Sequence, residues 1–561
     1  MIRIPVLSMR HWRRLWLCLA LSTYLLLTCY QLGLPGLHYD EAREAGLNAM
    51  ELLTGAPITA FRDAAIPFLG LRLPLMVQDY IGALNVYLVL PVLWASGIGV
   101  PNLRIVAVVT GLLTLLLVER TVSSWFWVVN RTHTAADSPS STVPLSLSLP
   151  GLLAITLLAA SPSFIFWSRQ GIFVTNLTQP LTFWCIWQGL RWLHTARKRS
   201  LLMSAFAGGC ALYAKLLAIW LVGPFILLAG GWWAWQRWRR QPAPPLSWPL
   251  FVAAALGFLL PLAPLLLFNW QSGGTWQAVT GNLGTSYYGV ETWALGANLA
   301  VRSRQLLQTL QGNHLWYLGG LYGNMLAPWL TLIVLPLGLW RHHRLLLGPL
   351  LLLLAAFGCS LITISDLFVT HYALLQPLLL AGIALALVAA VKAGANPFLI
   401  HHSRQFILAL FVVVWVLFDL TATLRYHAAL TRSGGLADHS DVSYHLAYHL
   451  QYNGLGAPIA LDWGFDAPVR YLSQGTVTPL EIFGYRSPTA PDPEFAQRLH
   501  LFLGNPANVY LLHTPAATIF RGRREQFLAA VQQDDRQAHL EATFAQRDGT
   551  PIVELWRVLS P

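Results

Sequence analysis

Charged side chains are scarce in this 561-residue chain. Asp, Glu, Lys and Arg make up only 11% of the residues, whereas 55% are hydrophobic. A water-soluble domain carries charge on roughly a quarter of its residues, because its surface must face water. Such a shortage excludes a wholly soluble protein and leaves lipid as the solvent that suits most of the chain. A mean hydropathy of +0.52 agrees with this reading.

Cysteine is scarce as well, and residues 427–561 contain none. All five cysteines lie in apolar runs: Cys18, Cys29, Cys185, Cys210 and Cys359. Neither a disulfide framework nor a cysteine metal site is therefore indicated. A basic face that continues through a soluble domain is also missing. The net charge of +12 is thus poor evidence for nucleic-acid binding, and no nucleic-acid partner is expected.

Long apolar runs are what the chain has in place of charge. A helix needs about 20 apolar residues to cross the hydrocarbon core of a bilayer. Twelve runs approach this length: Leu15–Leu34, Ile81–Ile98, Asn102–Val118, Leu149–Trp167, Leu177–Trp192, Leu201–Tyr213, Leu216–Trp235, Trp248–Phe268, Met325–Trp340, Leu345–Ile364, His371–Val391 and Phe406–Leu424. The first run is too long for a signal peptide and has no obvious cleavage site, so we expect a retained anchor.

Basic clusters in short connections predict the topology, because short loops rich in Lys and Arg stay cytoplasmic. There are four such clusters: Arg10–Arg14, Arg197–Arg199, Arg237–Arg240 and Arg341–Arg344. Counting from them places four regions outside: Lys215, the loops 270–324 and 365–370, and residues 427–561. This topology requires an odd number of crossings. Either Ile81–Ile98 is a half-span, or the stretch 102–130 hides two spans.

The expected fold class is mainly α. Residues 1–426 form a polytopic transmembrane helical domain of about 11–13 spans, with extracytoplasmic loops at 35–80 and 270–324. Residues 427–561 form a small extracytoplasmic α/β domain. The chain is expected in the cell membrane, with its site and this tail on the extracytoplasmic side.

In the tail, helix and strand patterns alternate. Helices are expected at Val442–Tyr452, Val469–Ser473 and Glu525–Gln532, strands at Pro458–Leu461 and Val509–Leu512, and a hairpin of Glu541–Arg547 with Pro551–Val558 around Asp548-Gly549.

Three histidines of the tail were weighed as metal ligands. His445 and His449 stand four residues apart, with His439 upstream. No Glu accompanies the pair as in the His-Glu-x-x-His arrangement, so a solvated helix face is the favoured reading. The tail shows no complete catalytic set. We expect an accessory role in acceptor binding or in covering a cavity.

Ionisable residues at the ends of spans are informative, because lipid penalises them. Residues 38–44, His-Tyr-Asp-Glu-Ala-Arg-Glu, follow the first apolar run. They predict an amphipathic helix on the outer membrane surface, capped by Asp40 and ended by Gly55. Its apolar stripe is Ala42, Ala45, Ala49 and Leu52. Asp40 is either only this cap or a carboxylate that takes the acceptor proton during sugar transfer.

Other residues at outer ends suit a phosphate leaving group: Arg169, Lys215, His371 and Tyr372. A departing lipid phosphate develops negative charge, which preorganised cations stabilise. The alternative for each side chain is simple snorkelling to the lipid headgroups. Asp79, just before the second apolar run, is a candidate second carboxylate.

In order and spacing, these motifs resemble the GT-C-type membrane glycosyltransferases, which include protein O-mannosyltransferases and lipid A aminoarabinose transferases. The resemblance rests on Asp40-Glu41 followed by Arg43, on Ser161-Pro162 with Ser168-Arg169, on Ala214-Lys215 and on His371-Tyr372. It spans the membrane region and, more loosely, the tail.

The resemblance implies an inverting transfer from a polyprenyl-phosphate sugar to a protein, lipid or glycan acceptor on the outer face. Protein glycosylation in the cell envelope is one such role. Asp40 would be the general base, with Glu41 beside it in the catalytic pair. The residues implied in substrate or phosphate binding are Arg43, Arg169, Lys215, His371 and Tyr372.

Some members of the family place a divalent metal ion near the first Asp. Asp40 and Asp79 would be the ligands here, and no other cofactor is implied. Asn176 stands where relatives usually have an acidic residue, which weakens the case for a metal. Asp366 stands where relatives often have Lys or Arg, which weakens phosphate binding at that loop.

Two other functions compete with this reading. A transporter or flippase for a lipid-linked or amphipathic solute typically shows internal repeats and helices broken near mid-membrane around polar sites. This sequence shows no repeat, and its polar residues gather at the outer ends of spans, which favours an enzyme. A non-catalytic scaffold is the third alternative.

Overall fold

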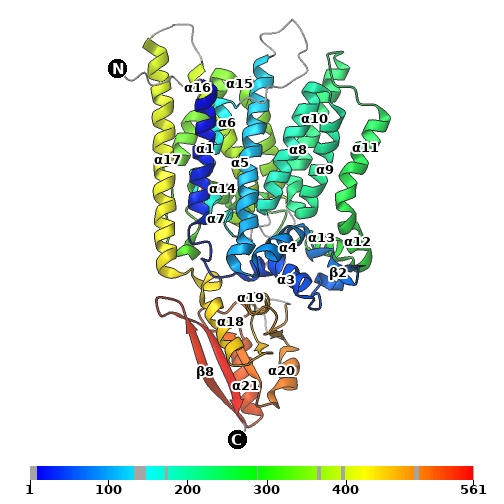
Figure 1. Ribbon diagram of the computed structural model, residues 1–561, viewed down its shortest axis with the longest axis vertical. Coiled ribbons are helices and arrows are strands. Elements are labelled where there is room, and N and C mark those ends of the chain that lie inside the picture. Colours follow the sequence, from blue (N-terminus) through cyan, green and yellow to red (C-terminus); the bar gives the residue numbers. More distant parts are fainter. Residues whose placement is uncertain are drawn as a thin grey trace.

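The computed structural model describes residues 9–131, 147–170, 175–286, 289–362, 368–392, 399–485 and 492–559. A helical bundle forms its upper part, and a smaller domain hangs from the lower end of the bundle (Figure 1). Helix α1 begins at the top of the bundle, whereas the C-terminus lies at the bottom of the small domain.

The bundle consists of helices that lie side by side along the long axis (Figure 1). Its first half contains α1 (Met9–Cys29), α5 (Val100–Arg131), α6 (Leu149–Ala160), α7 (Pro162–Trp167), α8 (Thr175–Thr195), α9 (Lys198–Ala214) and α10 (Ile219–Trp238). Its second half contains α11 (Trp248–Leu259), α12 (Ala263–Ser272), α15 (Ala327–Leu361), α16 (Gln376–Lys392) and α17 (Leu399–Ser433). Short turns η3 (Leu216–Ala218), η4 (Leu260–Leu262) and η6 (Val369–Leu374) join or extend them.

Within the described ranges, five helical segments are long and apolar enough to cross a membrane: 100–130, 216–238, 248–272, 327–361 and 406–433. Shorter apolar helices α6 and α16 pack beside them in one continuous core. The chain is therefore a multi-pass membrane protein, as its composition predicted.

The second apolar run of the sequence does not span the bundle. It forms strand β4 (Ile81–Gly82) and helix α4 (Leu84–Ser96), which has only 13 residues. At 1.5 Å per residue, such a helix reaches about 20 Å, short of the roughly 30 Å hydrocarbon core. The stretch 102–130 lies in the single helix α5. The half-span alternative is confirmed, and the alternative of two hidden spans is wrong.

The basic clusters lie at the end of the bundle opposite the small domain. Arg10–Arg14 lie in the first turns of α1, which begins at the top, and Arg197–Arg199 join α8 to α9. The cluster Arg341–Arg344 lies where α15 leaves helical geometry, at His342 (φ −148°, ψ 62°). The predicted spans Met325–Trp340 and Leu345–Ile364 therefore lie on either side of this break within α15. The positive-inside rule therefore predicts that the small domain lies outside.

Cysteine labelling tests this topology. In a background without the five native cysteines, we expect Tyr452→Cys to react with an impermeant maleimide on intact cells, because Tyr452 is 85% exposed in the tail. Trp238→Cys, at the other end of the bundle and 79% exposed, should react only after permeabilisation. The reverse pattern would place both the tail and the candidate site on the cytoplasmic side.

The loop after α1 contains helices α2 (Tyr39–Glu41) and α3 (Leu47–Thr54), joined by the π-helical turn η1 (Ala42–Gly46). The end at Gly55 is confirmed, with φ +74°. The predicted cap is wrong. His38 is the N-cap, and its side chain accepts a hydrogen bond from the Asp40 amide. The imidazole ring is long enough to reach this amide, which leaves the Asp40 carboxylate free of the capping role.

The predicted apolar stripe of this helix is buried, but not in lipid. Ala42, Ala45 and Ala49 are fully buried in a cluster that includes side chains of α4, of α5 and of α19 (Asp466–Leu472) in the tail. The ring of Tyr471 lies so close to Gly46 that a Cβ there would meet it at 2.9 Å. The tail therefore covers the helical segment 39–54. A sequence pattern cannot distinguish this cover from a membrane surface.

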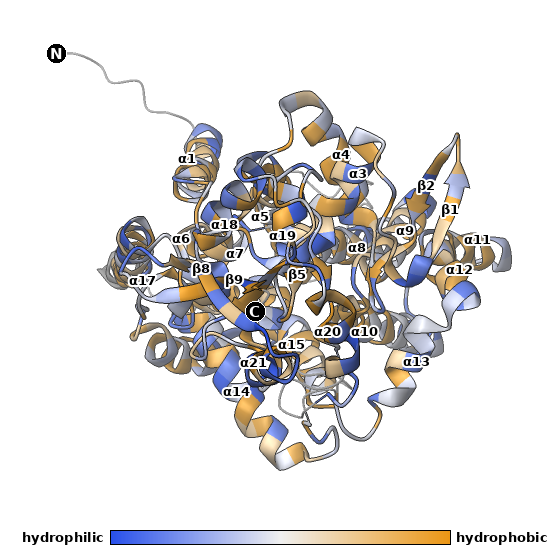
Figure 2. Cartoon of the chain, turned by 90° about the horizontal axis from the view of Figure 1, so that it is seen from below, coloured by the Kyte–Doolittle hydropathy of each residue, from blue (hydrophilic) through white to orange (hydrophobic). Residues whose placement is uncertain are grey.

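The rest of this loop forms two small hairpins beside α3. They are the turn η2 (Phe61–Asp63), the strands β1 (Ala65–Phe68) and β2 (Leu71–Pro74), and the strands β3 (Met76–Gln78) and β4. The second outer loop forms α13 (Gly274–Gly281), α14 (Leu295–Gln311) and η5 (Trp316–Leu318). The sequence also predicts a surface helix at Leu295–Leu310 in this loop, and α14 confirms it. Seen from below, β1–β2, α13 and α14 lie around the tail (Figure 2).

The tail is an α/β domain, as predicted. Its sheet has the order β6-β5-β7-β9-β8, with β5 parallel to β6 and β7, and β9 antiparallel to β7 and β8. The strands are β5 (Ile459–Ala460), β6 (Leu480–Glu481), β7 (Val509–His513), β8 (Gln537–Ala545) and β9 (Pro551–Leu559). The helices are η7 (Ala437–His439), α18 (Val442–Tyr452), α19 (Asp466–Leu472), α20 (Phe495–Leu503) and α21 (Arg523–Gln533). Of these elements, η7, α20 and β6 were not predicted.

Candidate functional site

Two carboxyl groups lie on one side of the short helix after α1. Asp40 is half-buried in α2, and Glu44 is buried one turn later, in η1. The charges of the two groups act on each other and on Lys215. Single π-helical turns are found frequently at functional sites. This turn, together with the His38 cap, fixes the direction in which Asp40 leaves the backbone.

Glu44 was not predicted as a site residue. The Gln78 amide donates a hydrogen bond of 3.1 Å to its Oε1. Its other oxygen is buried and accepts no hydrogen bond from the described residues. Burial raises the pKa of Glu44 well above its ordinary value, against the opposing pull of the Lys215 charge and with the help of Asp40. This shift favours the neutral form of Glu44.

Lys215 lies opposite these carboxyl groups. It follows α9 in an extended conformation (φ −160°, ψ 127°) and is only 8% exposed. Its hairpin is held against β3 and β4, because the Tyr213 hydroxyl donates to the Leu75 carbonyl at 2.9 Å and the Leu216 amide to the Tyr80 carbonyl at 3.0 Å. The described residues offer its ammonium no ion-pair partner within 4.0 Å. It is thus poised to pair with an anionic ligand.

His371 and Arg302 are the other two basic residues near Lys215. The ring of His371 is close enough to Lys215 and Arg302 for both charges to act on it. Its Nδ1 accepts a hydrogen bond of 3.1 Å from the Phe368 amide. Arg302 projects from α14, is 4% exposed and donates to Gln305 Oε1 at 3.3 Å. Pairwise electrostatic interactions therefore link two carboxyl groups and three basic groups at the tail end of the bundle.

Glu41, the second member of the predicted catalytic pair, points into the bundle instead. Both Glu41 and Arg104 of α5 are fully buried. Two parallel bonds of 2.8 Å join the guanidinium to both carboxylate oxygens, and Arg104 also donates to the Leu32 and Pro35 carbonyls at 2.9 Å. Both oxygens of this carboxylate are therefore already engaged by Arg104. Glu41 therefore fits a role in fixing the loop that carries Asp40.

This buried pair leads to a prediction about stability. We expect Glu41→Gln to destabilise the protein by about 3–5 kcal/mol, because it leaves the Arg104 charge buried without a counter-charge. The melting temperature of the protein in detergent should fall accordingly. Glu44→Gln is the matched control and should melt near wild type, since burial already favours the neutral form of Glu44. Equal melting of all three proteins would contradict this reading of the pair.

Arg169 and Tyr372 are both hydrogen-bonded within the bundle, although the charge of Arg302 also acts on Tyr372. The guanidinium of Arg169 is buried and donates to the Tyr30 and Gln31 carbonyls at 2.6 Å, where it ties α7 to the end of α1. The Tyr372 hydroxyl donates to Ser360 Oγ at 3.1 Å within the core of the bundle. Both side chains were expected at the phosphate, and here each stabilises helix packing.

Arg43 and Asp79 lie on other sides of the loop. Arg43 donates to the Thr59 carbonyl at 3.4 Å and faces the acidic groups Asp466 and Glu481 of the tail. Asp79 forms an ion pair of 2.7 Å with Arg62. Of the predicted site residues, the structure brings together Asp40, Lys215 and His371. Asp366, expected near His371, lies outside the described residues.

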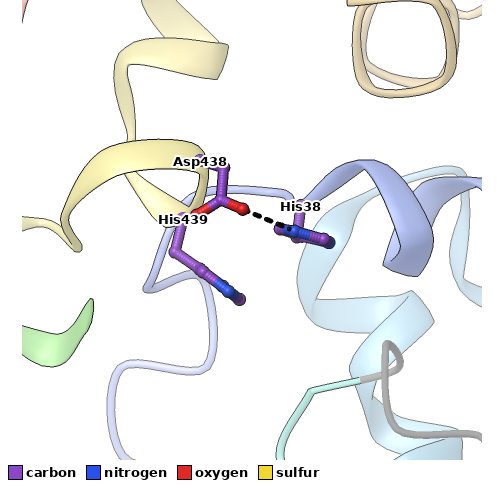
Figure 3. A group of neighbouring side chains, drawn as sticks. All are labelled: His38, Asp438 and His439. Atoms are coloured by element: carbon purple, nitrogen blue, oxygen red, sulfur yellow. Dashed lines mark hydrogen bonds and ion pairs between the residues drawn. The ribbon is translucent and has the colours of Figure 1, made fainter. Parts of the chain in front are cut away.

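The implied metal ligands do not gather at one point. Among the described residues, the single group of three metal-capable side chains is His38, Asp438 and His439, all within 4.8 Å (Figure 3). His38 Nε2 lies 3.0 Å from Asp438 Oδ2, and the rings of His38 and His439 stack 4.4 Å apart at 22°. His439 stacks in turn on Tyr317 at 4.1 Å.

The geometry of this group fits a hydrogen-bonded contact between the tail and the loop after α1 better than a metal centre. A metal lies in the plane of each ligating ring, and nearly parallel stacked rings direct their lone pairs side by side rather than at one point. His38 Nδ1 also accepts the Asp40 amide, so a neutral His38 carries its proton on Nε2, which faces Asp438. The hydrogen bond between Asp438 and His38 joins η7 of the tail to the N-cap of the helix that carries Asp40.

The comparisons with known proteins identify a fold. No family model matches the sequence, and no curated protein matches it. In the structure comparison, the chain shares its overall fold with solved structures of ArnT, which agrees at the level of fold with the resemblance drawn from its motifs.

Two of the similar structures are those of ArnT from Cupriavidus metallidurans. ArnT bound to undecaprenyl phosphate matches with a TM-score of 0.56 at 14% identity, over 98% of both chains. ArnT in the apo state matches with a TM-score of 0.58 at 14% identity, over 97% of this chain and 98% of that one. The bundle and the tail are thus both included in the match.

Proposed function

We propose that this chain is an integral membrane glycosyltransferase that takes its sugar from a polyprenyl-phosphate donor. The observation that carries the proposal is the fold, which the chain shares over its whole length with ArnT, a protein crystallised with undecaprenyl phosphate. The grouping of Asp40 and Glu44 opposite Lys215, His371 and Arg302 supports it, because such a site offers both a base and a place for an anion.

The proposed reaction is a single displacement at the anomeric carbon. Asp40 accepts the proton of the acceptor hydroxyl while the acceptor oxygen forms a bond to C1. The bond between C1 and the phosphate oxygen breaks, and the polyprenyl phosphate leaves with the electron pair. Attack from the face opposite the phosphate inverts the anomeric configuration. Lys215, His371 and Arg302 stabilise the charge that develops on the leaving phosphate.

The site is proposed on the outer face of the membrane. It lies at the tail end of the bundle, opposite the basic clusters, and the positive-inside rule assigns those clusters to the cytoplasm. The acceptor is a protein, a lipid or a glycan that reaches this face.

A transporter for a lipid-linked solute is the rival function. Discontinuous helices around mid-membrane polar sites are typical of transporters. The break between α6 and α7 at Ser161-Pro162 is of another kind, since it lies beside the outer loop, with Pro162 against Gly312. The candidate site also lies at one end of the bundle. Both observations favour an enzyme.

An assay on membranes tests the proposal. Membranes that contain the protein are incubated with a panel of radiolabelled polyprenyl-phosphate sugars and with envelope extract as the acceptor source. We expect label to pass from at least one donor to a product, and not in membranes that carry Asp40→Asn at the same protein level. Equal transfer in both membranes would remove Asp40 as the base, and no transfer from any donor would contradict the enzyme.

A further inference from the structure

A cavity separate from the candidate catalytic site lies where the tail meets the bundle. Its volume is about 400 Å³, within the range of small-molecule sites. One wall is the backbone around Gly99, where α4 gives way to α5. The other wall consists of side chains of α18 and α19. None of the residues that line the candidate catalytic site contributes to it. We name this cavity the seam cleft.

Two tyrosines hold the walls of the seam cleft together. The Tyr444 hydroxyl donates to the Gly33 carbonyl at 2.7 Å, and the Tyr471 hydroxyl donates to the Gly99 carbonyl at 3.1 Å. Each bond joins the tail to the bundle. The cleft is therefore built in advance of any ligand, because its tyrosines are anchored at both ends.

The remaining lining side chains are available to a ligand. Tyr448 is 47% exposed and follows Tyr444 by one turn of α18. Gln451 is half-buried and is held by a bond of 3.1 Å from its Nε2 to Thr476 Oγ1, so its amide plane has a fixed direction. Gln474 is exposed at the rim. The cleft thus combines aromatic faces with planar amides.

No charged residue lines the cleft. A phosphate, a carboxylate or an ammonium group would find no counter-charge in it and would have to lose water on entry. The lining instead suits a neutral ligand with apolar faces and many hydroxyl groups. A pyranose ring has this character, since its C–H face packs on an aromatic ring while its hydroxyls bond to amides and carbonyls.

We propose that the seam cleft binds a neutral saccharide of the acceptor. This inference rests on the proposed glycosyltransferase function, and it makes the acceptor a glycan or the sugar headgroup of a lipid. The cleft opens where the outer ends of α4 and α5 meet the tail, so that both sources can reach it. Tyr448 and Gln451 are the residues assigned to contact the sugar.

Direct binding tests this proposal without any turnover. The full-length protein is purified in a detergent without a sugar headgroup, because a glycoside detergent would compete for the cleft. Maltotriose, cellotriose and N-acetylated chitotriose serve as probes in saturation-transfer NMR. We expect at least one of them to bind, and Tyr448→Ala to weaken this binding roughly tenfold through the loss of one aromatic face.

The matched control is Tyr452→Ala. Tyr452 lies one turn further along α18, is 85% exposed and does not line the cleft, so its loss should leave binding unchanged. Equal binding by the two variants, or binding of none of the three probes by wild type, would overturn the proposal. Its failure is distinct from failure of the enzyme, because transfer in the membrane assay does not depend on this readout.

A second measurement separates the two sources of saccharide. Vesicles that carry a neutral glycolipid are compared with the free trisaccharide of the same sugar as competitors in the binding assay. Competition by the free sugar alone assigns the cleft to a soluble glycan, and stronger competition by the vesicles assigns it to a lipid headgroup. In the transfer assay, Tyr448→Ala should raise the acceptor KM roughly tenfold and leave kcat and the donor KM unchanged. A fall in kcat alone would also overturn the proposal.

Discussion

Asp40→Asn is expected to lower the transfer rate by roughly 100-fold or more, which is typical of a lost general base. The substitution keeps the shape of the side chain and removes its ability to accept a proton. The fold should not suffer, because His38 and not Asp40 caps the helix. Transfer rates and melting temperatures at matched protein levels measure the two effects separately.

Glu44→Gln is the control for Asp40. It removes a carboxylate one turn away whose neutral form is already favoured by burial, so we expect a smaller loss of rate. Near-normal turnover by Asp40→Asn together with a large loss in Glu44→Gln would make Glu44 the base. Large losses in both variants would indicate that the two carboxyl groups share one proton and act as a pair.

Lys215→Met is expected to have the second largest effect, a fall in kcat/KM for the donor of roughly 100–1000-fold. This is the range for loss of one preorganised group that stabilises developing negative charge. Methionine fills the volume of the lysine stem in this site, which is only 8% exposed, so the protein should still fold. Steady-state kinetics with varied donor concentration measures the change.

Arg169→Met is the comparison for Lys215→Met, because Arg169 and Lys215 were both expected to contact the phosphate. Arg169 is bonded to carbonyls at the end of α1, so its loss should lower the melting temperature and leave the kinetics of the folded fraction near wild type. Unchanged donor kinetics in Lys215→Met would contradict a role of Lys215 in phosphate binding. They would favour the alternative, in which its side chain only snorkels to the lipid headgroups.

The sequence order was enough to find one carboxylate and two basic residues of the site. Asp40, Lys215 and His371 each lie at an outer end of a span, where a charge in lipid has to be explained. Arg302 could not be found in this way. It lies on an amphipathic helix two residues before the exposed Arg304, and nothing in the pattern distinguishes the two. Only the packing of α14 against α15 and η6 buries one of them.

The roles of Glu41 and His38 were also beyond the sequence. Glu41 is adjacent to Asp40, but the helix turns its carboxylate toward Arg104, which stands 63 residues away. His38 meets Asp438 across 400 residues. Pairing of this kind depends on how the tail docks on the loop, and periodicity carries no information about it. The short reach of α4 was, by contrast, open to prediction from its length.

The central claim is that the protein transfers a sugar rather than moving a lipid. Purified protein in proteoliposomes, given the donor that is active in membranes and a matching acceptor, tests it most directly. The account predicts that free polyprenyl phosphate and glycosylated acceptor appear in equal amounts, and that neither appears with Asp40→Asn. Movement of the intact donor between leaflets, with no polyprenyl phosphate released, would contradict the enzyme and establish the transporter.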